Sequence, residues 1–102
     1  MFSIKANPTF DATLIIAGQS REQTLKVTFH HRTASALQTL MEAVQAGDKT
    51  TTDALLELID KWDADMALSA ESINTLREEQ PGADWAILAG YGNALMVARK
   101  GN

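Results

Sequence analysis

The stretch VTFHHRTASAL, residues 27–37, marks the point where the apolar residues change their period. Up to Phe29, apolar Leu25 and Val27 alternate with polar residues, which is typical of a strand with one buried face. Beyond it, apolar residues recur at intervals of three and four, which is typical of a helix. The stretch therefore predicts the end of a strand region and the start of a helical one.

The segment before this stretch predicts an antiparallel hairpin. Its first strand has apolar residues at alternate positions, namely Phe10, Ala12, Leu14 and Ile16. Residues 18–21, Gly-Gln-Ser-Arg, are suited to the turn that leads into the second strand. Phe2 and Ile4 offer a short extra strand ahead of Pro8, which cannot donate to a sheet and so belongs at a break or an edge.

Four helices are predicted after residue 31. The first has an apolar stripe formed by Leu37, Leu40, Met41 and Val44. We expect Ser35 and Gln38 to form a capping box at its start, and Gly47 to take the left-handed position after its end. The second helix has candidate N-caps in the threonine run 50–52, and its apolar face is expected to extend through Ile59 to Trp62.

The third helix is expected to begin at Ser69, with Leu68 and Ile73 packed as a hydrophobic staple. Pro81 is expected to end it and to be the first residue of the fourth helix, where Asp84 suits the helix dipole.

The fourth helix is apolar around most of its girth, which predicts a place near the core. Gly90 and Gly92 within it indicate close backbone contact, and Arg99, Lys100 and Gly101 are suited to its end. The predicted fold class is therefore α+β, with an N-terminal antiparallel β-hairpin followed by four α-helices in one domain that spans residues 1–102.

Composition narrows the classes of partner. The 102 residues are 45% hydrophobic, enough for one core, and 9 Lys and Arg against 13 Asp and Glu give a net charge of -4. This charge disfavours nucleic acid and anionic membrane surfaces. The chain has no cysteine, hence no disulfide or thiolate, and no apolar run long enough to cross a membrane, so we expect a cytoplasmic protein.

The paired histidines, His30 and His31, raise the question of a metal or catalytic site. Neighbouring strand residues point to opposite faces, so the two side chains cannot readily hold one ion. A zinc site also needs three or four ligands, and the chain has no further histidine or cysteine. We expect the pair to close a strand, and no metal.

The acidic segment DKWDAD, residues 60–65, resembles the opening of a calcium-binding loop. Counted from Asp63, however, Leu68 stands where the loop needs glycine, and Asn74 stands where it needs glutamate. We expect an acidic turn that ends a helix. Because phosphate-loop, nucleophile-elbow and zinc-protease motifs are also absent from the sequence, we expect neither an enzyme nor a cofactor.

Six stretches of the chain carry a resemblance: NPTF (7–10), VTFHHRT (27–33), LIDKWD (58–63), LSAESINTL (68–76), PGADWAILAGY (81–91) and ARKGN (98–102). Each alone is common, but in this order they span nearly the whole chain. Together they resemble the small tail assembly chaperones of long-tailed bacteriophages.

The resemblance implies a binding protein of the infected bacterial cytoplasm. Such a chaperone holds the tape-measure protein while the tail tube polymerises, and it is absent from the mature virion. The tail-tube protein and a longer, frameshifted form of the chaperone itself are further implied partners. A structural tail component, such as a tail terminator or a minor tail protein, is the alternative function.

Side-chain type suggests where partners bind. Trp62 and Trp85 suit either a core or an interface. We expect Trp62, Trp85, Tyr91 and Met96 to contribute to a client groove or to a self-association surface. A homo-oligomer is expected because one domain is far shorter than the client, and the hairpin edges offer a second route through strand pairing.

Overall fold

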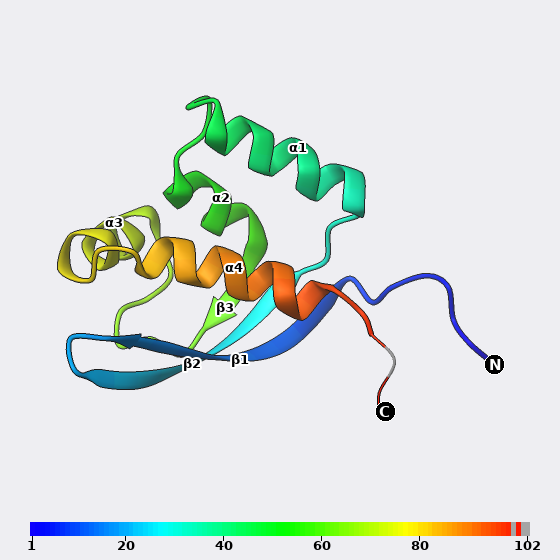
Figure 1. Ribbon diagram of the computed structural model, residues 1–102, viewed down its shortest axis with the longest axis horizontal. Helices are drawn as coiled ribbons and strands as arrows, with labels where there is room; N and C mark the ends of the chain where they lie inside the picture. Colours follow the sequence, from blue (N-terminus) through cyan, green and yellow to red (C-terminus); the bar gives the residue numbers. More distant parts are fainter. Residues whose placement is uncertain (99, 101–102) are drawn as a thin grey trace.

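The computed structural model describes residues 1–98 and Lys100. Along the chain, the elements are β1 (Thr9–Gly18), β2 (Arg21–His30), α1 (Ala34–Gln45), α2 (Thr51–Leu58), β3 (Ile59–Trp62), α3 (Ala70–Glu79) and α4 (Ala83–Leu95). The helices lie over one face of a three-stranded sheet, and α4 runs along the hairpin (Figure 1). The α+β prediction of a hairpin followed by four helices is confirmed.

The hairpin pairs without interruption from Thr9 opposite His30 to Gly18 opposite Arg21. Its two turn residues, Gln19 and Ser20, have φ angles of 54° and 62°, so both take the left-handed conformation that matches a two-residue turn to the strand twist. The sheet order is β1-β2-β3, which leaves β1 at one edge along its full length.

The third strand differs in place from the one that the sequence suggested. Phe2 and Ile4 lie outside any strand, and β3 pairs antiparallel with β2 instead. The spacing from Ile59 to Trp62 also fits a helical face, which is why the sequence predicts these residues as part of the second helix. Helix α2 ends at Leu58 because Ile59 takes an extended conformation, and its β-branched side chain is buried opposite Phe29.

The helix ends follow local capping chemistry. The N-cap of α1 is Thr33 rather than Ser35, since the Thr33 hydroxyl accepts from the Ala36 N–H at 3.2 Å. Gly47 takes the predicted left-handed position at φ 81°, and the Asp48 N–H donates to the Ala43 carbonyl in a Schellman motif. The predicted caps of the next two helices are confirmed, with Thr50 before α2 and Ser69 before α3.

The corner between α3 and α4 depends on a glycine. Gly82, at φ 95°, is the N-cap of α4, so Pro81 lies just before the cap and not at the first helical position. The left-handed turn that reverses the chain strongly favours glycine at a φ of 95°, and it places the start of α4 beyond the proline. Helix α4 ends at Leu95; of the residues predicted to end it, Arg99 and Gly101 lie outside the described residues.

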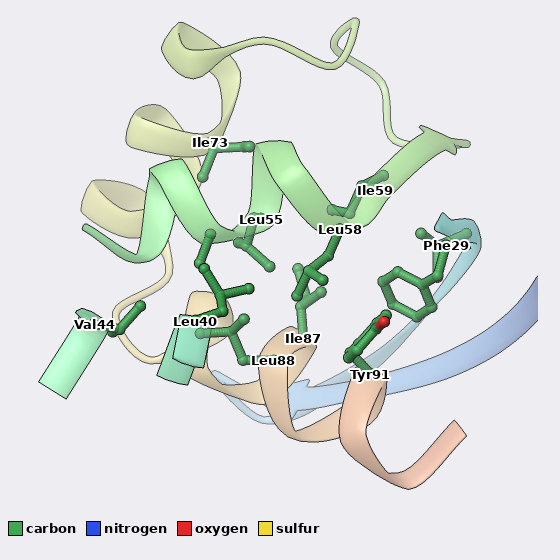
Figure 2. Packing of buried hydrophobic residues seen from close by; sticks show 12 residues of the cluster. Phe29, Leu40, Val44, Leu55, Leu58, Ile59, Ile73, Ile87, Leu88 and Tyr91 are labelled. Carbon is green, nitrogen blue, oxygen red and sulfur yellow. The ribbon is translucent and has the colours of Figure 1, made fainter. Parts of the chain in front are cut away.

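The core lies between the sheet and the helices (Figure 2). Its largest fully buried side chains are Phe29, Leu55, Leu58, Ile73, Ile87 and Tyr91. Gly90 lets α4 approach β1, because a Cβ there would lie 2.8 Å from Leu14 Cδ2, whereas a Cβ at Gly92 would meet no heavy atom within 4 Å. No helix among residues 1–98 is both long and apolar enough to cross a membrane.

Candidate partner-binding surface

The two histidines close β2 as predicted. His30 is the last residue of the strand, and the His31 N–H donates to the Pro8 carbonyl at 2.8 Å. His30 Nε2 lies 3.6 Å from Asp60 Oδ1 on the neighbouring strand, and both side chains are partly exposed. Within residues 1–98, no three His, Asp or Glu side chains are grouped so that they could hold a metal ion.

The acidic segment 60–65 does not end a helix, contrary to the prediction. Asp60 lies on β3, and Asp63 follows that strand. The Asp63 carboxylate accepts from the Lys26 backbone N–H at 2.8 Å, while the Asp63 N–H donates to the Lys26 carbonyl. Asp63 thus continues the pairing with β2. The prediction of a helix end here was wrong because the apolar spacing from Ile59 to Trp62 also fits a helix.

Tyr91, one of the four predicted contact residues, lies in the core. Its ring packs edge-on against Phe29, with ring centroids 4.9 Å apart, and its hydroxyl donates to the His30 carbonyl at 2.9 Å (Figure 2). Burial raises the pKa of the Tyr91 hydroxyl, although the nearby Arg32 guanidinium acts in the opposite direction. Tyr91 therefore joins α4 to the end of β2 rather than facing solvent.

The other three predicted contact residues lie at three separate places. Trp62 is partly buried against the core, and its indole N–H donates to the Met66 carbonyl at 2.9 Å. Trp85 is 50% exposed in the first turn of α4, and Met96 is 74% exposed just after its last turn. The structure thus brings Trp85 and Met96 to the two ends of one helix and places Trp62 elsewhere.

The solvent side of α4 carries no charge. We call this surface the α4 outer face; its exposed residues are Trp85, Ala86, Ala89, Asn93 and Ala94. The one charged residue of the helix, Asp84, is buried. The sequence analysis does not predict these alanines as contact residues, because small side chains are weak signals of a contact. The absence of charged side chains from residues 85–98 is visible in the sequence and could have indicated this face.

A buried polar cluster fixes the start of this face. Asp84 Oδ2 accepts from the Thr51 hydroxyl at 2.6 Å and lies 3.3 Å from Arg77 Nε. Arg77 also donates to the Thr52 hydroxyl at 3.1 Å. The cluster links α2, α3 and α4 at the residue before Trp85, so the indole projects from a turn that is held by contacts from two other helices.

A second surface lies near the hairpin turn. We call it the tip groove: a cavity of about 520 Å³ between the end of the hairpin, the 62–66 loop and α3. Its apolar lining includes Ile16, Leu25, Trp62, Met66, Leu76 and Ile87. Three acidic residues, Asp63, Asp65 and Glu79, also line it, against one basic residue, Arg21.

Comparison with known proteins assigns the family. A sequence model of the family described as phage tail assembly chaperone matches residues 1–102. No curated protein and no solved structure matches the chain. The match covers every residue, in agreement with the resemblance carried by the six sequence stretches, and the chain therefore belongs to the phage tail assembly chaperone family.

Proposed function

We propose that this chain binds the tape-measure protein of a phage tail, keeps it soluble and extended while the tail tube polymerises, and leaves before the virion is complete. The role is binding without catalysis, in the cytoplasm of the bacterial host. The family assignment supports a role in tail assembly. The tail-tube protein and a longer, frameshifted form of the chain are further proposed partners.

The α4 outer face is the observation that carries this proposal. A long client with amphipathic helices needs cover for its apolar stripes, and an uncharged helix face can cover one without desolvating any charge. Ala86 and Ala89 allow a client helix to approach closely, since neither side chain extends beyond its Cβ. Trp85 supplies the large half-exposed aromatic side chain that often dominates such contacts.

The fixed position of α4 favours binding without rearrangement. Tyr91 joins the middle of the helix to β2, and the Asp84 cluster holds its first turn. A surface that is already ordered loses little conformational entropy when a client binds, so more of the contact energy contributes to affinity.

The size of the face suits release. It spans one helix of 13 residues, which is about 20 Å at a rise of about 1.5 Å per residue. Such a surface buries less area than a stable permanent interface, so each copy is expected to bind weakly. Several copies along one client would together hold it firmly, yet each could be displaced in turn as tube subunits arrive.

Co-expression tests the proposal. The tape-measure protein encoded with this chain should be insoluble when expressed alone, and it should be soluble and co-purify with the chain when both are expressed. Recovery of soluble tape-measure protein that is equal with and without the chain, or failure of the two to co-purify, would contradict the proposal.

A further inference from the structure

The first seven residues form an exposed arm at the start of β1. Phe2 is 88% exposed and Ile4 is 93% exposed. Within the described part of the chain, the one hydrogen bond recorded for residues 1–7 is internal, from the Ser3 hydroxyl to the Lys5 carbonyl at 3.4 Å. With Met1, the arm therefore presents three large apolar side chains that its own fold does not cover, which is a common mark of a contact surface.

In an extended arm the Phe2 and Ile4 side chains share a face. Residues two apart along an extended segment point to the same side, so Phe2 and Ile4 project together while Ser3 and Lys5 project to the other. Residues 1–8 contain one charged side chain, that of Lys5. The arm thus offers a pair of apolar anchors beside one positive charge.

The tip groove complements such a segment. Its cavity of about 520 Å³ is within the range of about 300–1,000 Å³ found for ligand sites, and its lining includes the apolar side chains of Ile16, Leu25 and Leu76. Asp65 and Glu79 at the groove can attract a lysine beside the anchors. The groove is also braced, because Gln23 of the hairpin donates to Gln80 beyond α3 at 3.4 Å.

Folding back along β1 does not bring the arm into the groove of its own chain. The Pro8 carbonyl is fixed to the end of β2, at the opposite end of the hairpin from the turn. If the arm folded back along β1 through a two-residue turn at 7–8, Phe2 would lie beside Thr13. That position lies on the outer edge of β1, about 10 Å short of Ile16 along the strand and two strands away from Trp62 on β3.

Arm and groove lie at opposite ends of a molecule 45 Å long. In Figure 1 the arm extends at the right, whereas the hairpin turn and α3, which line the groove, lie at the left. We propose that the arm of one copy inserts Phe2 and Ile4 into the tip groove of a second copy, with Lys5 facing the acidic groove residues. The contact is head to tail, so it builds rows or rings of copies.

This proposal does not depend on the identity of the client. Sedimentation of the purified chain over a range of concentrations tests it, and the average mass is expected to rise with concentration. The double variant Phe2→Ser/Ile4→Ser removes the anchors, and Thr75→Arg blocks the groove from the exposed side of α3. Each should be monomeric, whereas Thr13→Arg, on exposed β1, should behave as the parent chain.

Mixing the two defective chains gives the sharper test. The arm variant keeps an open groove and the Thr75→Arg variant keeps its arm, so an equimolar mixture should form dimers that neither chain forms alone. Because each of these altered side chains is exposed, circular dichroism should show that both variants fold as the parent does.

Cross-linking distinguishes the groove from the sheet edge. The chain has no cysteine, so single cysteines can be introduced cleanly. A Ser3→Cys chain, which keeps both apolar anchors, should form a disulfide with an Ala64→Cys chain on oxidation, and a Thr13→Cys partner should not. Cross-linking to Thr13→Cys instead would place the arm on the edge of β1 and overturn the proposal.

Two further outcomes would also overturn it. One is a chain that stays monomeric at every concentration. The other is a Thr75→Arg chain that associates like the parent but no longer captures tape-measure protein, which would assign the groove to the client.

Lys5→Glu is expected to weaken self-association roughly two- to fivefold, in line with one exposed ion pair.

Discussion

The Thr51 hydroxyl donates a hydrogen bond of 2.6 Å to the carboxylate of Asp84, and this bond joins the first turn of α2 to the first turn of α4. Both residues are buried, and Arg77 of α3 approaches the same carboxylate oxygen. A buried carboxylate is tolerated when hydrogen bonds and an opposite charge satisfy it. The start of the α4 outer face is therefore set by contacts from two other helices.

Asp84→Ala is expected to lower the free energy of unfolding by about 2–3 kcal/mol, because it leaves Thr51 and Arg77 without their shared acceptor. The loss stays below that of a fully buried pair since the Arg77 side chain is 39% exposed. Thr51→Val should cost about 1–2 kcal/mol. Urea denaturation measures both, and a loss below about 0.5 kcal/mol for Asp84→Ala would show that the cluster is not stabilising.

Gly90→Ala is expected to be less stable than Gly92→Ala, because the new methyl group would lie within 3 Å of both Leu14 methyl carbons and the Leu14 side chain would have to shift. Overpacking of this kind typically costs about 1–3 kcal/mol. Gly92→Ala in the same helix is the matched control; it meets no neighbour and should be neutral or stabilising by up to about 1 kcal/mol. If the two variants have the same thermal midpoint, α4 is not held close to β1.

The raised pKa of Tyr91 predicts that the stability of the fold decreases at alkaline pH. Burial holds its folded-state pKa above the ordinary value of about 10, so the folded state favours the neutral hydroxyl. The corresponding stabilisation is fully present below pH of about 10 and is lost as the pH rises through the folded-state pKa.

The comparison with Tyr91→Phe isolates this effect. At neutral pH the variant should lose about 1 kcal/mol with the hydrogen bond to the His30 carbonyl. The stability difference between parent and variant should shrink as the pH rises above about 10. A difference that stays constant up to pH of about 11.5 would contradict the assignment.

How far the sequence predicted the fold depended on whether a signal was local. The alternation in β1, the caps at Thr50 and Ser69, and Gly47 after α1 were all visible because capping and turn chemistry acts within a few residues. Strand β3 was not visible in this way, because the step from Ile59 to Trp62 also fits a helical face. Its conformation is decided by pairing with residues of β2 that lie 30 to 35 positions earlier in the chain.

The candidate site, like the fold, was predictable only where the signal was local in the sequence. Side-chain type identified Trp85 and Met96, which the fold leaves exposed, but it could not separate them from Tyr91, which lies in the core. Tyr91 falls on the inner side of α4 because its hydroxyl finds the His30 carbonyl there, a partner 61 residues away in the chain. The tip groove joins residues from five segments, so sequence spacing carried no sign of it.

Trp85→Ala is expected to weaken capture of the tape-measure protein at least tenfold, since loss of a central aromatic anchor commonly costs about 2 kcal/mol or more in binding. Ile15→Ala, which removes an exposed apolar side chain from β1, is the control and should leave capture unchanged. Binding is measured with purified client fragment and with variants that melt as the parent does. Equal loss in both variants would remove the α4 outer face as the client site.

The most direct measurement follows the chain through tail assembly. Quantitative mass spectrometry would compare complexes isolated on tagged tape-measure protein before the tube forms with purified finished tails. We predict several copies of the chain on each unassembled tape-measure protein and none in finished tails. A fixed number of copies retained in finished tails, or no copies on the unassembled client, would contradict the account.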